Sequence, residues 1–241
     1  MIEIKNVTKF YNKKTNVIDK LNLTINDGEI FGFLGPNGAG KTTTINMISG
    51  ILEINEGDIL IDGKSIIKEP IEAKKRMGLV SDNPNSFIKL KGIEYLNFIA
   101  DAYDVNTTDR KKIIEEDARK FELYEYLNNK IESYSHGMRQ KLMILGSLIH
   151  TPQNWLLDEP MVGLDPKASF ELKKEMRKYA NENKCVFFST HVLDVAEKIC
   201  DRIGIIDKGK LIFIGSYEEM KKELKENKSL EELFMEIIKY E

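Results

Sequence analysis

The sequence predicts an α/β fold in which a mostly parallel β-sheet carries helices on both faces. Short apolar segments of strand length alternate with helical patterns, and a glycine-rich turn joins one such segment to a helix. Residues 30–34, preceded by the turn pair Asp27-Gly28, predict a buried strand, and residues 42–49, ended by Gly50, predict the helix. A buried strand, a glycine-rich loop and a helix in this order are typical of a phosphate-binding site.

The loop between this strand and helix matches the pattern G-x-x-x-x-G-K-[ST] and reads Gly35-Pro36-Asn37-Gly38-Ala39-Gly40-Lys41-Thr42-Thr43. Its glycines let the backbone approach phosphates without Cβ clashes, and the helix N-terminus points N–H groups at them. We expect Lys41 to reach the β- and γ-phosphates and the Thr42 hydroxyl to ligate Mg²⁺. An ordinary glycine-rich turn is the alternative, but the complete motif between a strand and a helix favours a nucleotide.

Composition excludes several classes of protein. The chain has 241 residues and 41% hydrophobic content, enough for one large domain with a full core. Its net charge of -3 does not indicate a nucleic-acid partner. No apolar run approaches the roughly 18 residues of a membrane-spanning helix, and residues 1–4 do not resemble a signal peptide. With only Cys185 and Cys200, we expect neither a disulfide framework nor a cysteine metal site, and a reducing cytoplasm.

The N-terminal part predicts antiparallel sheet. Apolar residues within 2–25 come in short strand-like pieces, and residues 59–61 resemble the arm of a hairpin. Tyr11 lies in this region and is our candidate for stacking on the adenine base, with Phe10 as its competitor. A packed strand aromatic is the alternative for Tyr11.

The middle of the chain predicts helices after a short strand at residues 77–80 and a polar loop at residues 81–86. Apolar residues recur at helical spacing in residues 93–103, in the segment after Thr108 and in residues 138–149. We interpret these apolar faces as core, not as cofactor-binding surface.

Two adjacent carboxylates follow the next apolar strand, residues 155–157. Asp158 and Glu159 therefore stand at the carboxyl end of a strand, where phosphate-binding α/β folds place their ligand. We expect Asp158 to hold Mg²⁺, directly or through water, and Glu159 to polarise an attacking water. An acidic cap on the following segment is the alternative, which the upstream phosphate loop makes less favourable.

The remaining segments complete the predicted sheet. Asp165 and Pro166 predict the N-cap and first residue of a helix. Residues 185–189 predict another buried strand, which delivers His191 to the same edge. For His191 a γ-phosphate contact and a structural role are equally open from the residues alone. Residues 203–214 predict a hairpin. The charged end of the chain predicts a helix with one apolar face formed by Leu230, Leu233, Phe234 and Ile237.

One segment separates this chain from other proteins with a phosphate loop. It reads Ser135-His136-Gly137-Met138-Arg139-Gln140-Lys141 and resembles the signature motif of ATP-binding cassette (ABC) ATPases. The resemblance covers residues 1–216. It identifies the phosphate loop as the Walker A motif, the strand ending at Asp158 as Walker B, residues 163–165 as the D-loop and His191 as the switch histidine.

The resemblance implies a RecA-like core with an N-terminal antiparallel β subdomain, an inserted helical subdomain at approximately residues 84–152, and a helical extension at residues 217–241. It also implies a head-to-tail dimer in which each ATP lies between the Walker A loop of one subunit and the signature of the other. Ser135 and Gly137 would complete the partner's phosphate site, a helix N-terminus being suited to anions. Asp165 belongs to the expected nucleotide-binding residues through the D-loop.

Two motifs depart from the family pattern. The signature usually reads Leu-Ser-Gly-Gly-Gln, whereas residues 134–138 read Tyr-Ser-His-Gly-Met. Asp82 stands where a glutamine usually senses Mg²⁺ and couples to the membrane domain; a carboxylate accepts hydrogen bonds or meets Mg²⁺ but cannot donate as an amide does. Both variations are similar to those in bacterial exporters of drugs, peptides or lantibiotics, whose ATPase and membrane protein are separate chains.

The resemblance therefore implies an ATP- and Mg²⁺-dependent ATPase subunit of an exporter, peripheral on the cytoplasmic face of the membrane. Its partners would be an integral membrane permease on a separate chain and a second copy or a related cassette, with no nucleic acid. A soluble ABC ATPase acting in translation or on DNA is the main alternative, and a P-loop kinase would have no use for the segment at Ser135. The sequence does not identify the cargo.

Overall fold

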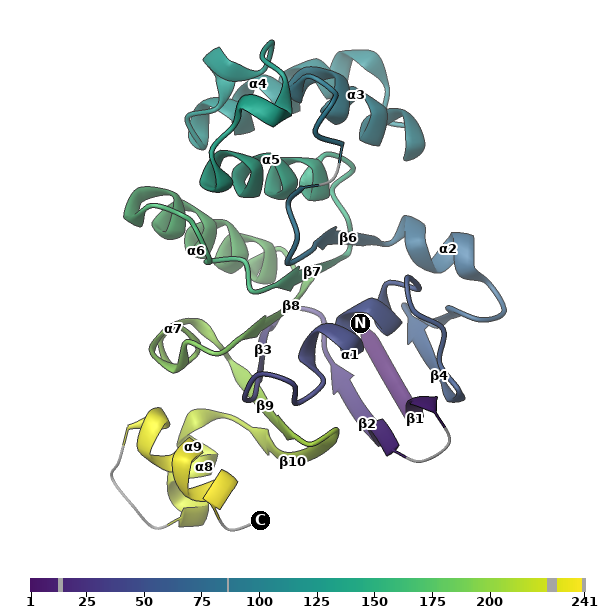
Figure 1. The fold of residues 1–241 in the computed structure, drawn as a ribbon, viewed down its shortest axis with the longest axis vertical. Helices are drawn as coiled ribbons and strands as arrows, with labels where there is room; N and C mark the ends of the chain where they lie inside the picture. Colours follow the sequence, from purple (N-terminus) through teal and green to yellow (C-terminus); the bar gives the residue numbers. More distant parts are fainter. Residues whose placement is uncertain (13–14, 86, 225–228, 240–241) are drawn as a thin grey trace.

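The computed structural model describes residues 1–12, 15–85, 87–224 and 229–239 and contains two β-sheets (Figure 1). The larger sheet has six strands, with parallel pairing from β9 to β6 and one antiparallel pair, β10 with β9. Its strands are, in spatial order, β10 (Lys210–Gly215), β9 (Arg202–Asp207), β3 (Ile30–Leu34), β8 (Cys185–Thr190), β7 (Asn154–Asp158) and β6 (Met77–Val80).

The smaller sheet is antiparallel and has four strands. In spatial order they are β2 (Thr15–Ile25), β1 (Ile2–Asn12), β4 (Glu56–Ile61) and β5 (Lys64–Ser65). The helix after the phosphate loop, α1 (Lys41–Ile48), packs between the two sheets, because its residues Ile45 and Ile48 belong to the same core cluster as β1 and β3 (Figure 1).

Successive residues of the central strands face opposite sides of the larger sheet, as the two-residue period of a strand requires. Leu156 and Phe187 join the core that includes α1, whereas Trp155 and Phe188 join the core on the other face. Strands covered on both faces are apolar without alternation. This explains why each central strand reads as a continuous hydrophobic run.

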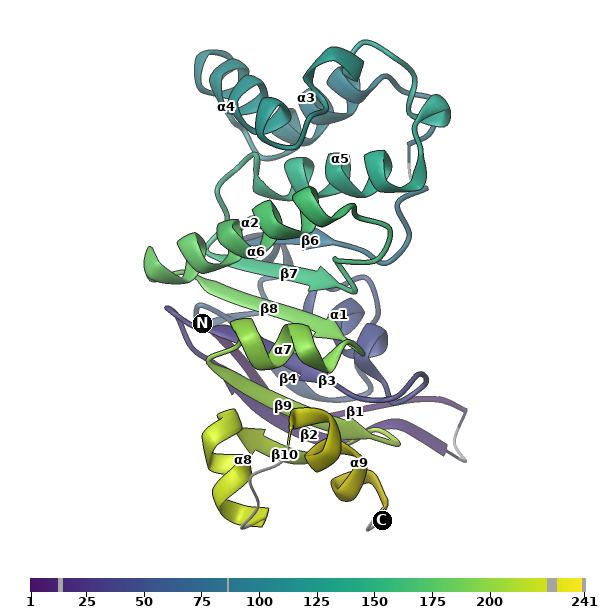
Figure 2. The same cartoon turned by 90° about the vertical axis from the view of Figure 1, so that its left-hand side faces the viewer.

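Helices cover the face of the larger sheet that is turned away from α1 (Figure 2). Three of them gather above the sheet edge at β6, namely α3 (Gly92–Ala102), α4 (Thr107–Lys120) and α5 (His136–Leu148). The others in this part of the fold are α6 (Pro166–Asn181) and α7 (Leu193–Ile199), with the short 3₁₀ turns η1 (Tyr124–Tyr126) and η2 (Ile131–Ser133) near α5.

The chain ends in α8 (Tyr217–Leu224) and α9 (Leu230–Lys239), which lie beside α7 and the hairpin of β9 and β10 (Figure 2). Leu230 and Leu233 of α9 are fully buried in a cluster with Ala196 of α7. The expected apolar face of this last helix is therefore present at these positions; the side chain of Ile237 and all of Ser86 lie outside the described part of the chain.

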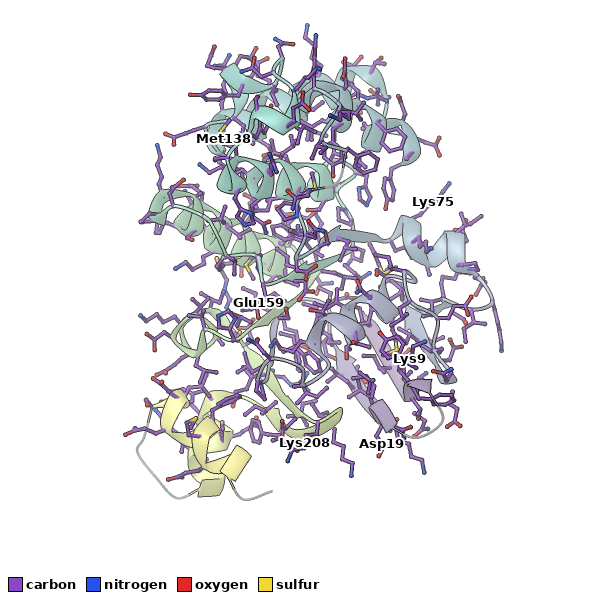
Figure 3. All side chains as sticks on the ribbon, in the orientation of Figure 1. Lys9, Asp19, Lys75, Met138, Glu159 and Lys208 are labelled. Atoms are coloured by element: carbon purple, nitrogen blue, oxygen red, sulfur yellow. The ribbon has the colours of Figure 1, made fainter. Side chains whose placement is uncertain are left out.

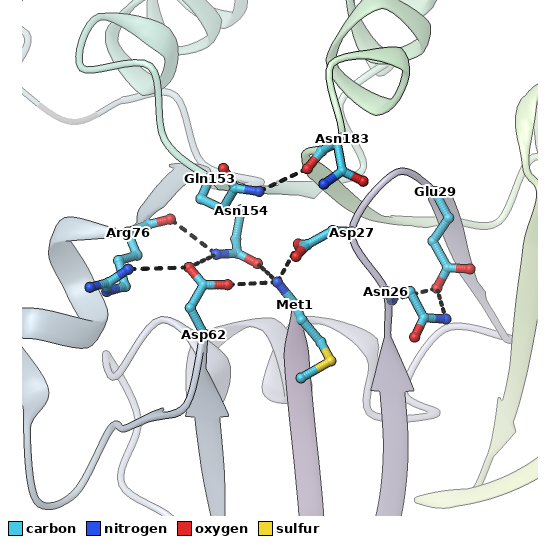
Figure 4. Close-up of polar contacts among 9 residues, drawn as sticks. All are labelled: Met1, Asn26, Asp27, Glu29, Asp62, Arg76, Gln153, Asn154 and Asn183. Atoms are coloured by element: carbon cyan, nitrogen blue, oxygen red, sulfur yellow. Dashed lines mark hydrogen bonds and ion pairs between the residues drawn. The ribbon is translucent and has the colours of Figure 1, made fainter.

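A polar cluster joins the two sheets at the edge opposite the carboxyl ends of the parallel strands (Figure 4). The amino group of Met1 contacts Asp27 and lies 2.6 Å from Asp62 Oδ1 and 3.0 Å from Asn154 Oδ1. The buried Asn154 side chain in turn donates to Asp62 Oδ2 at 3.0 Å. These bonds link β1 and the β4–β5 turn to the start of β7.

Several helix boundaries differ from the sequence expectations. The helix expected after Thr108 begins at Thr107, because Asn106 is the N-cap that accepts from the backbone N–H groups of Thr108 and Asp109. The helix expected from Met138 begins at His136, two residues earlier, because Ser135 caps it. Two short helices were not expected: α2 (Pro70–Lys75) and α7 each bury a single side chain, too few for a periodic pattern.

Within the described residues, no helix combines the length and the apolar character needed to cross a membrane.

Candidate active site

Backbone hydrogen bonds and the side chain of Lys41 fix the conformation of the loop between β3 and α1. Gly209, from the β9–β10 turn, donates its N–H to Ala39 O at 3.0 Å. Lys41 is buried to 7% exposure, and its Nζ donates to Gly35 O at 2.8 Å and Pro36 O at 3.3 Å. The Lys41 ammonium is thereby fixed inside the curve of the loop.

Gly40 shows why the loop needs glycine at its final turn. Its φ of +113° is in the left-handed region, and a Cβ there would lie 2.5 Å from Ile18 Cδ1. Any other residue would be strained in its backbone and would also push aside the tip of the Ile18 side chain in β2. The glycine therefore allows the smaller sheet to pack directly behind the phosphate loop.

A cavity of about 280 Å³ opens in front of this loop. Most of its walls are phosphate-loop residues, and two carboxylates from other elements complete it. The lining residues are Asn37, Gly38, Gly40, Lys41, Thr42, Thr43, Asp82 and Glu159. The structure thus brings together residues from three separate segments that the sequence singled out.

Asp158 ends β7 and is 2% exposed. The Ser189 hydroxyl of the neighbouring strand β8 donates to Asp158 Oδ1 and accepts the backbone N–H of Glu159 at 3.1 Å. Burial raises the pKa of Asp158, and the negative charges of Asp82 and Glu159 act in the same direction, against the hydrogen bonds from the Ser189 and Thr42 hydroxyls. A cation at this position would remove the repulsion.

Glu159 follows with an uncommon backbone conformation, a φ of 47°. At this residue the backbone turns away from the direction of β7, and the Glu159 side chain lies next to His191 and Lys41. Its Oε1 lies 2.9 Å from His191 Nδ1 and 3.7 Å from Lys41 Nζ. Glu159 is 18% exposed and lines the cavity, whereas His191 is 53% exposed and reaches the site only through its contact with Glu159. Figure 3 shows Glu159 near the centre of the molecule.

The segment with Ser135 lies at a different place, at the N-terminus of α5. Ser135 is exposed, and its Oγ accepts the backbone N–H of Met138 at 3.2 Å. Neither Ser135 nor Gly137 lines the cavity of its own chain. Figure 3 shows Met138 well away from Glu159, in the helical region above the sheet.

Gly137 lies against the expected D-loop. A Cβ on Gly137 would be 2.5 Å from Gly163 O, and the ring of His136 packs over Gly163. Nearby, Asp165 caps α6 by accepting from Ala168 N at 2.9 Å and pairs with Lys141 Nζ at 2.7 Å. The hydrogen bond from Lys141 lowers the pKa of Asp165 to about 2. The D-loop and the start of α5 are therefore joined within one chain.

Tyr11 is 66% exposed near the end of β1 and is absent from the cavity lining. The Nζ of Lys9 lies 5.4 Å from its ring centroid. Its stacking on adenine stays a prediction.

Sequence reasoning missed Ser189 and Lys141. Ser189 carried a signal, since it is the only hydroxyl within the expected strand 185–189 at the carboxylate edge, whereas Lys141 resembled any helix lysine.

A buried lysine in the glycine-rich loop after β3, with carboxylates at the end of β7, which is separated from β3 by β8 in the same parallel sheet, defines the class of P-loop proteins that bind a nucleoside triphosphate. The family follows from comparison with known proteins. Residues 18–162 match the family model described as ABC transporter. The chain belongs to this family, as an ATPase subunit of an ABC transport system.

Relatives and solved structures agree with this assignment. The chain is 42% identical over 220 residues to the uncharacterized ABC transporter ATP-binding protein YhcH of Bacillus subtilis, an alignment that covers 91% of this chain and 71% of the relative. Its identity to the linearmycin resistance ATP-binding protein LnrL of the same species is 36% over 220 residues, covering 91% and 70%.

Among solved structures, the ATP-binding subunit of an ABC transporter superposes with a TM-score of 0.94 at 28% identity and covers 99% of both chains. A dimeric post-hydrolysis state of the ATP-binding cassette MJ0796, bound to ADP and Pi, superposes with a TM-score of 0.81 at 26% identity over 90% of this chain and 98% of that one. The predicted fold class and the predicted ATPase activity are confirmed.

Proposed function

We propose that this chain drives export of a substrate by closing as a dimer on ATP and reopening after hydrolysis, beneath a permease on a separate chain. The export direction is supported by the similarity to LnrL, a relative named for resistance to linearmycin. The proposed location is peripheral, on the cytoplasmic face of the membrane. The second subunit is another copy or a related cassette.

The position of Ser135 supports the dimer proposal, in which each chain would supply half of each active site. Lys41 and Glu159 meet in the cavity, while the cap residue Ser135 is exposed to solvent outside it. The N–H groups at the N-terminus of α5 could bind an anion, but they lie outside the cavity in which this chain would hold its own ATP. We assign Ser135 and Gly137 to the phosphates of an ATP bound to the partner, with Asp165 supporting the adjoining D-loop.

The residues at the cavity fit Mg²⁺. No group of three or more His, Cys, Asp or Glu side chains in the described residues could hold a metal unaided. Mg²⁺ in nucleotide sites needs only one or two protein ligands, because phosphates and waters supply the rest. Thr42 and Asp158 would be those ligands, with Asp82 within reach through water; the bound ion would neutralise charge on the β- and γ-phosphates.

Catalysis would consist mainly of positioning and electrostatic stabilisation, as in other P-loop enzymes. Residues 35–43 would wrap the phosphates, and Lys41 would move from its carbonyl partners to compensate phosphate charge. Glu159 would orient the attacking water, and His191, already 2.9 Å from Glu159, would contact the γ-phosphate. Tyr11 is our candidate for the adenine base, because its ring is exposed and has room to stack.

The same proposal assigns the parts of the chain. Residues 1–216 form the ATPase domain, with a helical insertion at approximately residues 84–152 that carries the Ser135 surface toward the partner. Residues 217–241 form a C-terminal helical extension.

The test is ATP-dependent dimerisation of the full chain. Glu159→Gln removes the group that orients water but keeps the shape of the side chain, so this variant should accumulate as an ATP-bound dimer in gel filtration. Adding Ser135→Arg should abolish that dimer while leaving ATP binding by the monomer within about twofold, since Ser135 does not line the chain's own cavity. Loss of monomer binding in Ser135→Arg would show that Ser135 acts within its own chain.

The transport part needs a separate experiment. Full-length chain purified gently from its native membranes should copurify with a protein that has several apolar segments of about 20 residues. Copurification with ribosomes or DNA in place of a membrane protein would support the alternative soluble function.

A further inference from the structure

Arg139, half-buried in the first turn of α5, makes side-chain hydrogen bonds to two other segments of the chain. Its Nε donates to Ile131 O at 3.2 Å and its Nη2 donates to Glu132 O at 2.9 Å, both in η2. Its Nη1 donates to Asn85 Oδ1 at 2.6 Å, in the loop that follows β6. One planar guanidinium therefore bonds to two segments that are far apart in sequence.

On one side of this contact is the loop that contributes Asp82 to the ATP cavity. Asn85 is three residues after Asp82, and the intervening loop is tied together, because Asn83 Oδ1 accepts from Asn85 N at 3.1 Å and Asn83 O accepts from Ser81 Oγ at 3.2 Å. A displacement of Asp82 by a bound nucleotide would therefore be passed to Asn85.

On the other side is the N-terminus of α5. The backbone N–H of Arg139 donates to Ser135 O at 3.0 Å, in the first turn of the helix. The two carbonyls that its guanidinium contacts belong to η2, which ends two residues before Ser135. Arg139 thus fixes the chain on both sides of Ser135.

We infer that Arg139 is a positioning residue that couples the two ATP sites of the dimer. It transmits the position of the Asp82 loop, set by ATP in the chain's own cavity, to Ser135, which faces the ATP of the partner. This inference rests on the proposed function, since it requires that Ser135 act across a dimer. Asn85 is the receiving end of the coupling, because its bond to Arg139 joins the loop directly to α5.

The experiment separates the bond between the segments from the bonds within η2. Asn85→Ala removes only the loop's acceptor, Asn85→Asp keeps an acceptor oxygen, and Arg139→Lys replaces three directional donors by a point charge. Lys89→Ala is the matched control: it breaks the exposed Lys89–Glu132 ion pair, 3.0 Å long, which joins the same two segments without involving Arg139. All four are made in the full chain carrying Glu159→Gln.

Two affinities are measured for each variant: monomer binding of a fluorescent ATP analogue, and ATP-driven dimerisation by analytical ultracentrifugation. Asn85→Ala and Arg139→Lys should weaken dimerisation about tenfold, the usual effect of losing one charge-assisted hydrogen bond, with monomer ATP affinity unchanged within about twofold. Asn85→Asp should dimerise like the parent, and so should Lys89→Ala, because exposed ion pairs contribute little.

Equal weakening of monomer binding and dimerisation would overturn the inference, since Asn85 would then simply support the cavity. Parent-like dimerisation of Asn85→Ala would overturn it as well. In both cases the parent still dimerises, so the proposed function stands. Failure of the Glu159→Gln parent to dimerise on ATP would refute the proposed function and the coupling together.

Discussion

His150 makes the stability of the fold depend on pH in a way that can be calculated. Its ring stacks on Tyr103 with centroids 3.6 Å apart, and its Nε2 lies 3.0 Å from Met77 O. Its Nδ1 is buried and has no hydrogen-bond partner. Protonating Nδ1 would place an unpaired N–H in an apolar site, and burial accordingly lowers the pKa of His150 from 6.5 to about 4.

The sign and size of the effect follow from this pKa. Below pH 6.5 His150 binds a proton in the unfolded chain but not in the folded chain, so the free energy of unfolding falls as the pH decreases toward 4. Between pH 7 and pH 5 the loss is about 2 kcal/mol, from the ratio of proton binding in the two states. Between pH 7 and pH 8 His150 should change the stability by less than about 0.2 kcal/mol.

The assay is urea denaturation of the full chain and of His150→Phe at pH 8, 7 and 5. Phenylalanine retains the stacking surface for Tyr103 but cannot take up a proton. Other titrating groups act equally in both proteins, so the difference between the two pH dependences isolates His150. The parent should lose about 2 kcal/mol more than the variant between pH 7 and pH 5. Parallel pH dependences would show that the buried ring accepts a proton without penalty and would refute the argument.

Three further predictions concern the active site. Lys41→Ala should lower ATP turnover by about 100-fold or more, because a fixed charge at the phosphates is lost; turnover close to the parent's in a phosphate-release assay would exclude the loop as the ATP site. Gly137→Ala should destabilise the chain by about 1–3 kcal/mol in urea denaturation, since its Cβ would lie 2.5 Å from Gly163 O, and an unchanged midpoint would mean that the two backbones separate freely. Lys141→Met should change the free energy of unfolding by at most about 1 kcal/mol, because its partner Asp165 is half exposed. NMR titration of this variant should nevertheless show the pKa of Asp165 rising from about 2 toward 3.8. A pKa that stays near 2 would show that the helix cap, and not Lys141, causes the shift.

The parts of the site that sequence could predict are those encoded within one short segment. The phosphate loop needs glycine and lysine at fixed spacing, and Asp158 and Glu159 follow directly on an apolar strand. In both segments the chemistry depends on neighbours along the chain. Ser135 was different: only the resemblance to the ABC signature pointed to it, and the apolar pattern placed the start of the helix that it caps two residues too late.

The parts that sequence could not predict depend on pairing between distant segments. Ser189 reaches Asp158 only because β8 is placed beside β7, and many alternative strand orders fit the same apolar runs. The contact of Arg139 with Asn85 spans 54 residues and leaves no periodic trace. Short helices such as α2 were not predicted for another reason: a helix that buries one side chain has no periodic apolar face in the sequence.

The separation of Ser135 from the cavity of its own chain has a genetic consequence. In the proposed dimer each site draws its phosphate loop from one copy and its Ser135 surface from the other. A mixed dimer of a Lys41→Ala copy with a Ser135→Arg copy would therefore carry both lesions in one site and none in the second. These two alleles, each inactive alone, should therefore complement one another in the same cell. Two alleles that both carry a lesion in the phosphate loop should not, because every site of their mixed dimer would have a damaged loop.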